Sequence, residues 1–153
     1  FRSSIGHARL KDLYDYWDRL RGTGSLPPRG AFDPLHIPQL LPNIILNEVV
    51  GVPPRFRIRV EGSAVSAARG FDATGRFLDE PGVIVLRGDP LGAYAGIVMT
   101  GAPWYCEGSF SESSGRAGRL FRLALPLGGD DGAVRFILVG FFHELTRAPS
   151  ARS

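Results

Sequence analysis

The stretch that decides the fold runs from Arg119 to Glu144 and reads RLFRLALPLGGDDGAVRFILVGFFHE. It contains two apolar runs, residues 119–126 and 133–144, with a cluster of Gly and Asp residues at 128–132 between them. Apolar runs rich in aromatic and β-branched residues are typical of buried strands, and a Gly/Asp cluster supplies the turn that joins them. The stretch therefore predicts an antiparallel pair of long strands near the end of the chain.

Two runs further upstream also predict strands. Residues 44–50 are apolar and β-branched, whereas residues 55–60 alternate arginines with apolar residues. Such alternation is typical of a half-buried strand, and it places Phe56, Ile58 and Val60 on one face. Gly and Pro residues between the two runs supply a turn.

Residues 104–110 form the remaining predicted strand, with only a short connection to the strand at 119–126. Because the last three strands follow one another through short connections, we expect them to form an antiparallel meander. Adding the strands at 44–50 and 55–60 gives one antiparallel sheet of five strands. Both faces of the strand at 133–144 carry apolar residues, so both faces of the sheet must be covered.

A helix is predicted at residues 4–21, where apolar residues recur at helical spacing and two glycines follow. Its apolar stripe can cover a face of this chain's own sheet, or it can pair with a second copy in a homodimer, and the pattern leaves both open. The candidate dimer contacts on this stripe are Leu10, Leu13, Tyr14, Trp17 and Leu20.

Three shorter helices are predicted at residues 34–41, 62–69 and 89–100. Asp33 precedes a proline at the start of the first, and Asp89 does the same for the last, which is the pattern of an N-cap followed by Pro at the first helical position. The element order predicts an α+β fold: a five-stranded antiparallel sheet with helices on one face and an N-terminal helix. Either this helix or a partner is expected to cover the other face.

The chain divides into three predicted parts. Residues 1–30 comprise the N-terminal helix and a Pro/Gly-rich connector, residues 31–146 form the sheet domain, and residues 147–153 form an unstructured tail.

Composition and charge exclude several classes of protein. The net charge is +3, and the densest basic cluster, Arg55, Arg57 and Arg59, alternates with apolar residues as a solvated sheet face would, so nucleic-acid binding is not supported. No apolar run approaches the ~18 residues that a membrane span requires. The lone Cys106 excludes an internal disulfide and fits a reducing cytoplasm.

Three segments resemble, in the same order and spacing, a bacterial subfamily of PAS domains. They are YWDRLRGTGSLPPRGAFDP at residues 16–34, RIRVEG at 57–62 followed by GFDATGR at 70–76, and LPL at 125–127 before a Gly/Asp turn. The resemblance implies five antiparallel strands, helices across one face and a pocket between them. It also implies a domain that binds small molecules or cofactors, forms homodimers and passes a conformational change to an effector.

The positions of the histidines disfavour a haem. A haem held in a PAS domain needs an axial ligand, usually His, on the helix that faces the pocket. The predicted helix at 89–100 contains no His, and its Met99 would be an axial ligand without a second one beside it. The three histidines, His7, His36 and His143, belong to other elements.

A flavin photosensor and a metal site are disfavoured as well. The reactive cysteine of a light-sensing PAS domain belongs to a helix, whereas Cys106 lies in a predicted strand and is interpreted as a small core residue. His143 and Glu144 are adjacent, so on a strand they point to opposite faces and cannot share a metal. The cofactor, if one exists, stays unknown at this point.

The helix at 89–100 and the sheet are expected to meet in an aromatic seam. Such a seam can enclose a small apolar ligand, or it can simply be a filled core, and both interpretations remain open. The candidate ligand-binding residues are Phe56, Ile58, Tyr94, Ile97, Val98, Trp104, Phe121 and Phe136.

The expected function is binding and signalling, because no motif of nucleophilic or phosphate-binding catalysis is present. We expect a sensory domain that binds a small molecule or a signalling protein and acts through homodimerisation in the bacterial cytoplasm. The alternatives are an interaction-only dimerisation module with a filled core and a small-molecule enzyme that uses the seam.

Overall fold

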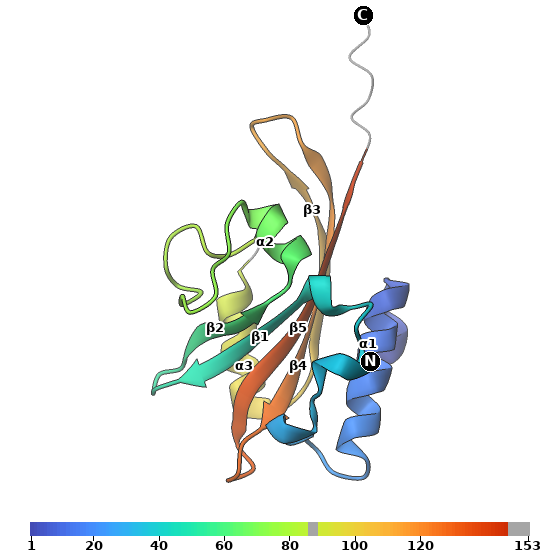
Figure 1. Ribbon diagram of the computed structural model, residues 1–153, viewed down its shortest axis with the longest axis vertical. Helices are drawn as coiled ribbons and strands as arrows, with labels where there is room; N and C mark the ends of the chain where they lie inside the picture. The colour runs from blue at the N-terminus through green and yellow to red at the C-terminus, as the bar shows by residue number, and fades with distance from the viewer. Residues whose placement is uncertain (86–88, 147–153) are drawn as a thin grey trace, which may run out of the picture.

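The computed structural model describes residues 1–85 and 89–146. The predicted tail at 147–153 lies outside the described residues. One five-stranded sheet and three α-helices make up the fold (Figure 1). The elements are α1 (Ala8–Arg21), β1 (Ile44–Val50), β2 (Arg55–Glu61), α2 (Ser63–Arg69), α3 (Pro90–Thr100), β3 (Trp104–Ser111), β4 (Ala117–Gly128) and β5 (Val134–Leu145).

All neighbouring strands are antiparallel, and their order in the sheet is β2-β1-β5-β4-β3. This order confirms the predicted meander of the last three strands. The stretch that predicted the fold forms β4 and β5, the longest pair of strands in the sheet. The last strand, β5, lies at the centre of the sheet between β1 and β4.

The helices lie on opposite faces of the sheet. Figure 1 shows α1 on one side and α2 and α3 on the other. Two clusters of buried apolar residues result, an α1-side cluster and an α3-side cluster, separated by the sheet. The predicted N-terminal helix is present, and in the single chain it is this helix that covers the second face.

The apolar stripe of α1 packs against this chain's own sheet. Leu10, Leu13 and Trp17 are each at most 1% exposed, and the Trp17 indole Nε1 donates a hydrogen bond to the carbonyl oxygen of Pro126 at 2.8 Å. Gly140 on β5 makes room for the helix, because a Cβ there would lie 2.5 Å from Leu10 and 2.7 Å from Leu13. In the single chain, the stripe of α1 therefore covers this chain's own sheet.

Two of the predicted helices differ in the structure. α1 begins at Ala8 because the first residues form a separate 3-10 turn, Arg2–Ser4. The helix predicted at 34–41 is replaced by the 3-10 turns Pro34–His36 and Leu41–Asn43. Asp33 caps the first of them as predicted, but prolines within and after this segment lack the N–H groups that an α-helix needs.

The prediction that Val60 lies on the same face of the strand as Phe56 and Ile58 was wrong. Leu46 on β1 pairs with Val60 and the next residue, Asn47, pairs with Ile58, so Arg59 is an extra residue in β2. Such a bulge reverses the alternation of side chains beyond it. Val60 therefore leaves the face of Ile58 and is 43% exposed.

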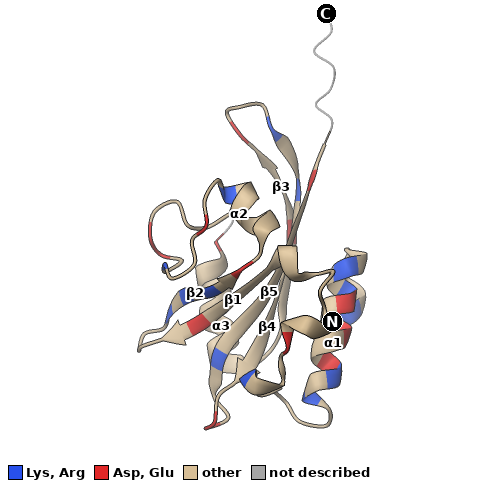
Figure 2. Cartoon of the chain, in the orientation of Figure 1, with Lys and Arg blue, Asp and Glu red and all other residues tan. Residues whose placement is uncertain are grey.

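The charged surface is mixed. Figure 2 shows acidic and basic segments interspersed along α1 and the strands. In the predicted arginine cluster, Arg55 pairs with Asp79 at 2.7 Å and Arg57 pairs with Glu48 at 2.6 Å. Of the helices in the described ranges, none is long and apolar enough to cross a membrane.

Candidate functional site

The seam between α3 and the sheet contains most of the predicted pocket residues. Tyr94 is its central side chain, with its ring 5.7 Å from that of Phe56 and 6.1 Å from that of Trp104, in edge-to-face geometry. Such aromatic contacts fill space and fix the position of α3. The predicted residues that the structure brings together here are Phe56, Ile58, Tyr94, Ile97, Val98 and Trp104.

Phe121 and Phe136 lie on the other side of the sheet, so their assignment to the seam was wrong. Both belong to the α1-side cluster or pack against it. Successive residues of a strand point to opposite faces, and on β4 it is the neighbour of Phe121, Arg122, that points toward α3. Because both faces of β4 and β5 are apolar, the sequence does not reveal which set of alternate residues faces which helix.

A small cavity of about 20 Å³ remains inside the seam, which we call the inner cavity. This volume suffices for about one water molecule. Polar and apolar groups border it together, which is unusual for a gap in a filled core. The lining residues are Ile45, Asn47, Arg69, Leu78, Val83, Ile84, Val85, Pro90, Tyr94 and Arg122.

Asn47 on β1 is 1% exposed, yet neither its amide nitrogen nor its amide oxygen has a hydrogen-bond partner in the described part of the chain. Leaving a buried amide unpaired costs roughly 1–3 kcal/mol. The great majority of buried polar groups in proteins are paired, so an exception such as this indicates a missing partner.

Arg122 on β4 is 3% exposed. Its Nη2 donates to the carbonyl oxygen of Val85 at 2.9 Å, and its guanidinium lies 5.2 Å from the ring centroid of Phe141. Within residues 1–85 and 89–146, no carboxylate oxygen lies within 4.0 Å of this guanidinium. Arg122 is therefore a buried cation whose charge is balanced by no neighbouring anion of the described chain.

The charge of the second arginine at the inner cavity, Arg69, is balanced by the carboxylate of Glu61. Its Nη1 donates to Glu61 Oε2 at 2.6 Å, while Nη2 contacts Glu61 Oε1 at 2.6 Å as an ion pair without hydrogen-bond alignment. The same carboxylate also accepts from the Ser66 hydroxyl and from the backbone N–H of Ala73. These bonds fasten α2 and the turn after it to the end of β2, so this pair is structural.

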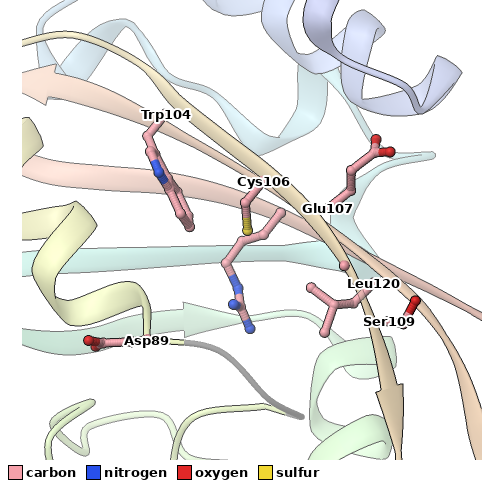
Figure 3. Close-up of a pocket in the computed structure, with 8 residues that line it drawn as sticks. Asp89, Trp104, Cys106, Glu107, Ser109 and Leu120 are labelled. Carbon is pink, nitrogen blue, oxygen red and sulfur yellow. The ribbon is translucent and has the colours of Figure 1, made fainter.

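A larger hollow of about 340 Å³ opens on the surface beside the inner cavity, which we call the outer hollow. Figure 3 shows Trp104 and Cys106 pointing to one side of β3 and Glu107 pointing to the other. Arg122 borders both spaces, so the outer hollow and the inner cavity meet at this side chain. The outer hollow is lined by Asp89, Trp104, Cys106, Glu107, Gly108, Ser109, Leu120 and Arg122.

Two titratable groups near Arg122, the thiol of Cys106 and the hydroxyl of Tyr94, stay neutral at physiological pH. Burial raises the pKa of the Cys106 thiol, and the charge of Arg122 offsets this only in part. A thiol of this kind is a poor nucleophile. Burial also raises the pKa of Tyr94 to about 12, so its hydroxyl stays protonated. The site is therefore suited to binding rather than to nucleophilic chemistry.

The residues present do not fit a haem or a flavin. The inner cavity is far too small for either ring system, and the helix over it, α3, contains no His. His7 stacks on Phe142 in the α1-side cluster, and His36 contacts Tyr16 on the same side. In the described ranges no three His, Cys, Asp or Glu side chains gather in a way that could hold a metal ion.

The predicted dimer contacts divide into two groups. The side chains of Leu10, Leu13 and Trp17 are buried within one chain and cannot reach a second copy while α1 stays on the sheet. Tyr14 and Leu20 are only partly buried at the edge of the α1-side cluster. Of the predicted stripe, these last two are accessible to a partner.

Sequence reasoning missed Asn47 and Arg122. A usable signal was present, because each is a single polar residue inside an otherwise apolar run, IILNEVV on β1 and LFRLAL on β4. Polar residues at strand positions that face a core are buried and need a partner. For such a position, the sequence therefore raises the question of which group pairs with the buried side chain.

Comparisons with known proteins agree with this fold. The family model of the PAS domain matches residues 5–138. A comparison with curated proteins gave no significant match.

Solved structures give distant likenesses. A light-oxygen-voltage domain studied with a flavin analogue is 14% identical, with a TM-score of 0.52 over 72% of this chain and 82% of that one. The PAS domain of BvgS from Bordetella pertussis is 15% identical, with a TM-score of 0.44 over 76% of this chain and 90% of that one. At 14% identity the likeness to the light-oxygen-voltage domain concerns the fold alone. Since the family model covers nearly the whole described chain, the protein belongs to the PAS domain family.

Proposed function

We propose that this PAS domain is a sensor that binds a small molecule between α3 and the sheet. The observation that carries the proposal is the meeting of the outer hollow and the inner cavity at the buried Arg122. Ligand sites are typically concave, largely apolar and roughly 300–1,000 Å³ in volume, with a few polar groups that fix orientation. The outer hollow, with Trp104 and Leu120 as apolar walls and Arg122 as its polar group, fits that description.

The central strand supports a route by which binding could be passed on. Ile137 and Val139 of β5 belong to the α3-side cluster, whereas Leu138 between them belongs to the α1-side cluster. A displacement of α3 by a ligand would press on the strand that also supports α1. Close-packed interiors transmit such strain instead of absorbing it.

The N-terminal helix is the proposed place of contact with a second copy or a signalling protein. Tyr14 and Leu20 are partly exposed there, and the ring of Phe1, which is 50% exposed, lies 5.6 Å from that of Tyr14. We propose that these side chains contribute to a homodimer. The lone Cys106 is compatible with the bacterial cytoplasm as the place of action.

The test combines native mass spectrometry with a variant that fills the outer hollow. Gly108 lines the hollow, and a Cβ built on it would meet no atom within 4 Å, so Gly108→Leu should fill the space without a clash. Protein purified without denaturation should carry a stoichiometric small-molecule adduct that Gly108→Leu removes. The control is Gly96→Leu on the exposed side of α3, where a Cβ also meets no atom within 4 Å and the adduct should persist.

A second candidate function is that of an interaction-only dimerisation module. The small volume of the inner cavity and the dense aromatic packing around Tyr94 favour it. In that case native mass spectrometry should give a clean dimer without an adduct, and Gly108→Leu should change nothing but stability.

A further inference from the structure

We infer that the molecule bound at this site is a small organic monocarboxylate, with its charged group held by Arg122 and Asn47 and its apolar body in the outer hollow. The inference rests on the proposed function, because it names the class of ligand that the same site takes.

The charge balance of the interior is the first argument. Two guanidinium groups, Arg69 and Arg122, border the inner cavity, and the one carboxylate paired there, Glu61, belongs to Arg69. A guanidinium keeps its charge at any physiological pH, so Arg122 cannot avoid burial of a charge by losing a proton. Burying an unbalanced charge is costly, and an anion bound beside it would remove that cost.

The free donors are the second argument. A guanidinium has five N–H groups in a planar fork, and Val85 accepts from Nη2 of Arg122. A planar carboxylate matches such a fork with two parallel hydrogen bonds. Asn47 borders the same cavity with an unpaired amide that can donate to a carboxylate oxygen, and it is 1% exposed. The same water-sized space is thus bordered by Asn47, whose amide has no partner in the described chain, and by Arg122, whose charge has no carboxylate beside it there.

The residues that line the outer hollow indicate the chemistry of the uncharged part of the ligand. Trp104 and Leu120 offer apolar contact to a ring or a short alkyl chain. Asp89 is a second polar residue that lines this hollow, whereas the carboxylate of Glu107 points to the other side of β3 and pairs with Arg119. An acidic side chain at Asp89 repels a second negative charge on the ligand. This arrangement favours a monocarboxylate over a dicarboxylate, a phosphate ester or a nucleotide.

The experiment compares carboxylates with amides of the same shape by isothermal titration calorimetry. The probes are benzoate with benzamide, phenylacetate with phenylacetamide, and hexanoate with hexanamide. At least one carboxylate should bind with a Kd below about 1 mM, and its amide roughly 30-fold more weakly, as expected when a buried charge loses its ionic partner. Arg122→Met should abolish the preference for the acid.

The matched control is Arg119→Met, an arginine on the same strand that is exposed and paired with Glu107 on the other side of the sheet. It should leave carboxylate binding unchanged. If Arg122→Met does not fold, Arg122→Lys keeps the charge but loses the fork, and it should bind the carboxylate about tenfold more weakly. Asn47→Leu should weaken binding and, in the ligand-free protein, raise the urea midpoint.

The outcomes separate this inference from the proposed function. Amides that bind as tightly as the acids would overturn the carboxylate inference while leaving a small-molecule sensor in place. Carboxylate binding that survives unchanged in both Arg122 variants would overturn it too. If no probe binds below about 1 mM and the purified protein carries no adduct, both proposals fail together.

Discussion

The two faces of the sheet are built from different kinds of residue. The α1-side cluster is mostly apolar, and the polar atoms of its buried members Tyr16 and Trp17 are hydrogen-bonded. His7 also packs on this side, against Phe142, and its Nδ1 is the buried polar atom there that has no partner in the described chain. The α3 side contains the two buried polar residues, Asn47 and Arg122, and the buried pair of Glu61 with Arg69. The buried groups that carry a charge, Arg122 and the pair of Glu61 with Arg69, all lie on the α3 side, which is the face to which we assign the proposed ligand site.

The largest expected loss of stability comes from a substitution in the α1-side cluster. Trp17→Ala should reduce the free energy of unfolding by about 4 kcal/mol, because it leaves a large cavity between α1 and the sheet. Urea unfolding monitored by circular dichroism measures this loss. Trp17→Phe, which retains most of the volume and loses the hydrogen bond to Pro126, should cost much less. A loss below about 1 kcal/mol for Trp17→Ala would show that α1 contributes little to stability.

A smaller effect is expected from the buried pair on the polar face. Glu61→Gln keeps the shape of the side chain but leaves the charge of Arg69 unbalanced, at a cost of about 3 kcal/mol. The double variant Glu61→Leu with Arg69→Met removes both charges and should recover most of that loss in the same unfolding experiment. If the double variant is as unstable as the single one, the charge imbalance is not the cause.

The smallest effect is a dependence of stability on pH. Burial lowers the pKa of both His7 and His143 in the folded chain. As the pH falls below about 6.5, the unfolded chain therefore takes up protons before the folded chain does, and the free energy of unfolding decreases until the folded pKa values are passed. His7→Phe retains the stacking on Phe142 and should make the urea midpoint less sensitive between neutral and mildly acidic pH. An equally steep loss in this variant would mean that His7 has no part in it.

The fold could be predicted from the sequence because local signals coincide with its elements. Strand β1 was predicted with its observed bounds, Ile44–Val50, since turn residues enclose a β-branched run. The Gly/Asp cluster at 128–132 likewise separates β4 from β5 as predicted. Turn chemistry acts within a few residues, so one sequence is enough to read it.

The site could be predicted only in part, for reasons that involve distant residues. Tyr94 and Trp104 were placed in the seam, because a helix with an apolar face must pack on the sheet. The assignment of Phe121 was wrong, because β4 is apolar on both faces and only packing decides which residues meet α3. The reversal at Arg59 is set by pairing between β1 and β2, which no local pattern reports. The importance of Arg122 depends on the absence of a nearby anion in three dimensions.

The central position of β5 also sets the order in which the chain can fold. Both neighbours of β5 precede it in the sequence, and Ile45 pairs with Val139, nearly the whole length of the domain away. During synthesis, β1 and β4 therefore remain open edges until the last strand leaves the ribosome. Topologies dominated by such distant pairings fold slowly, and unpaired edges promote aggregation. A chain shortened within β5 should therefore aggregate rather than form a smaller sensor.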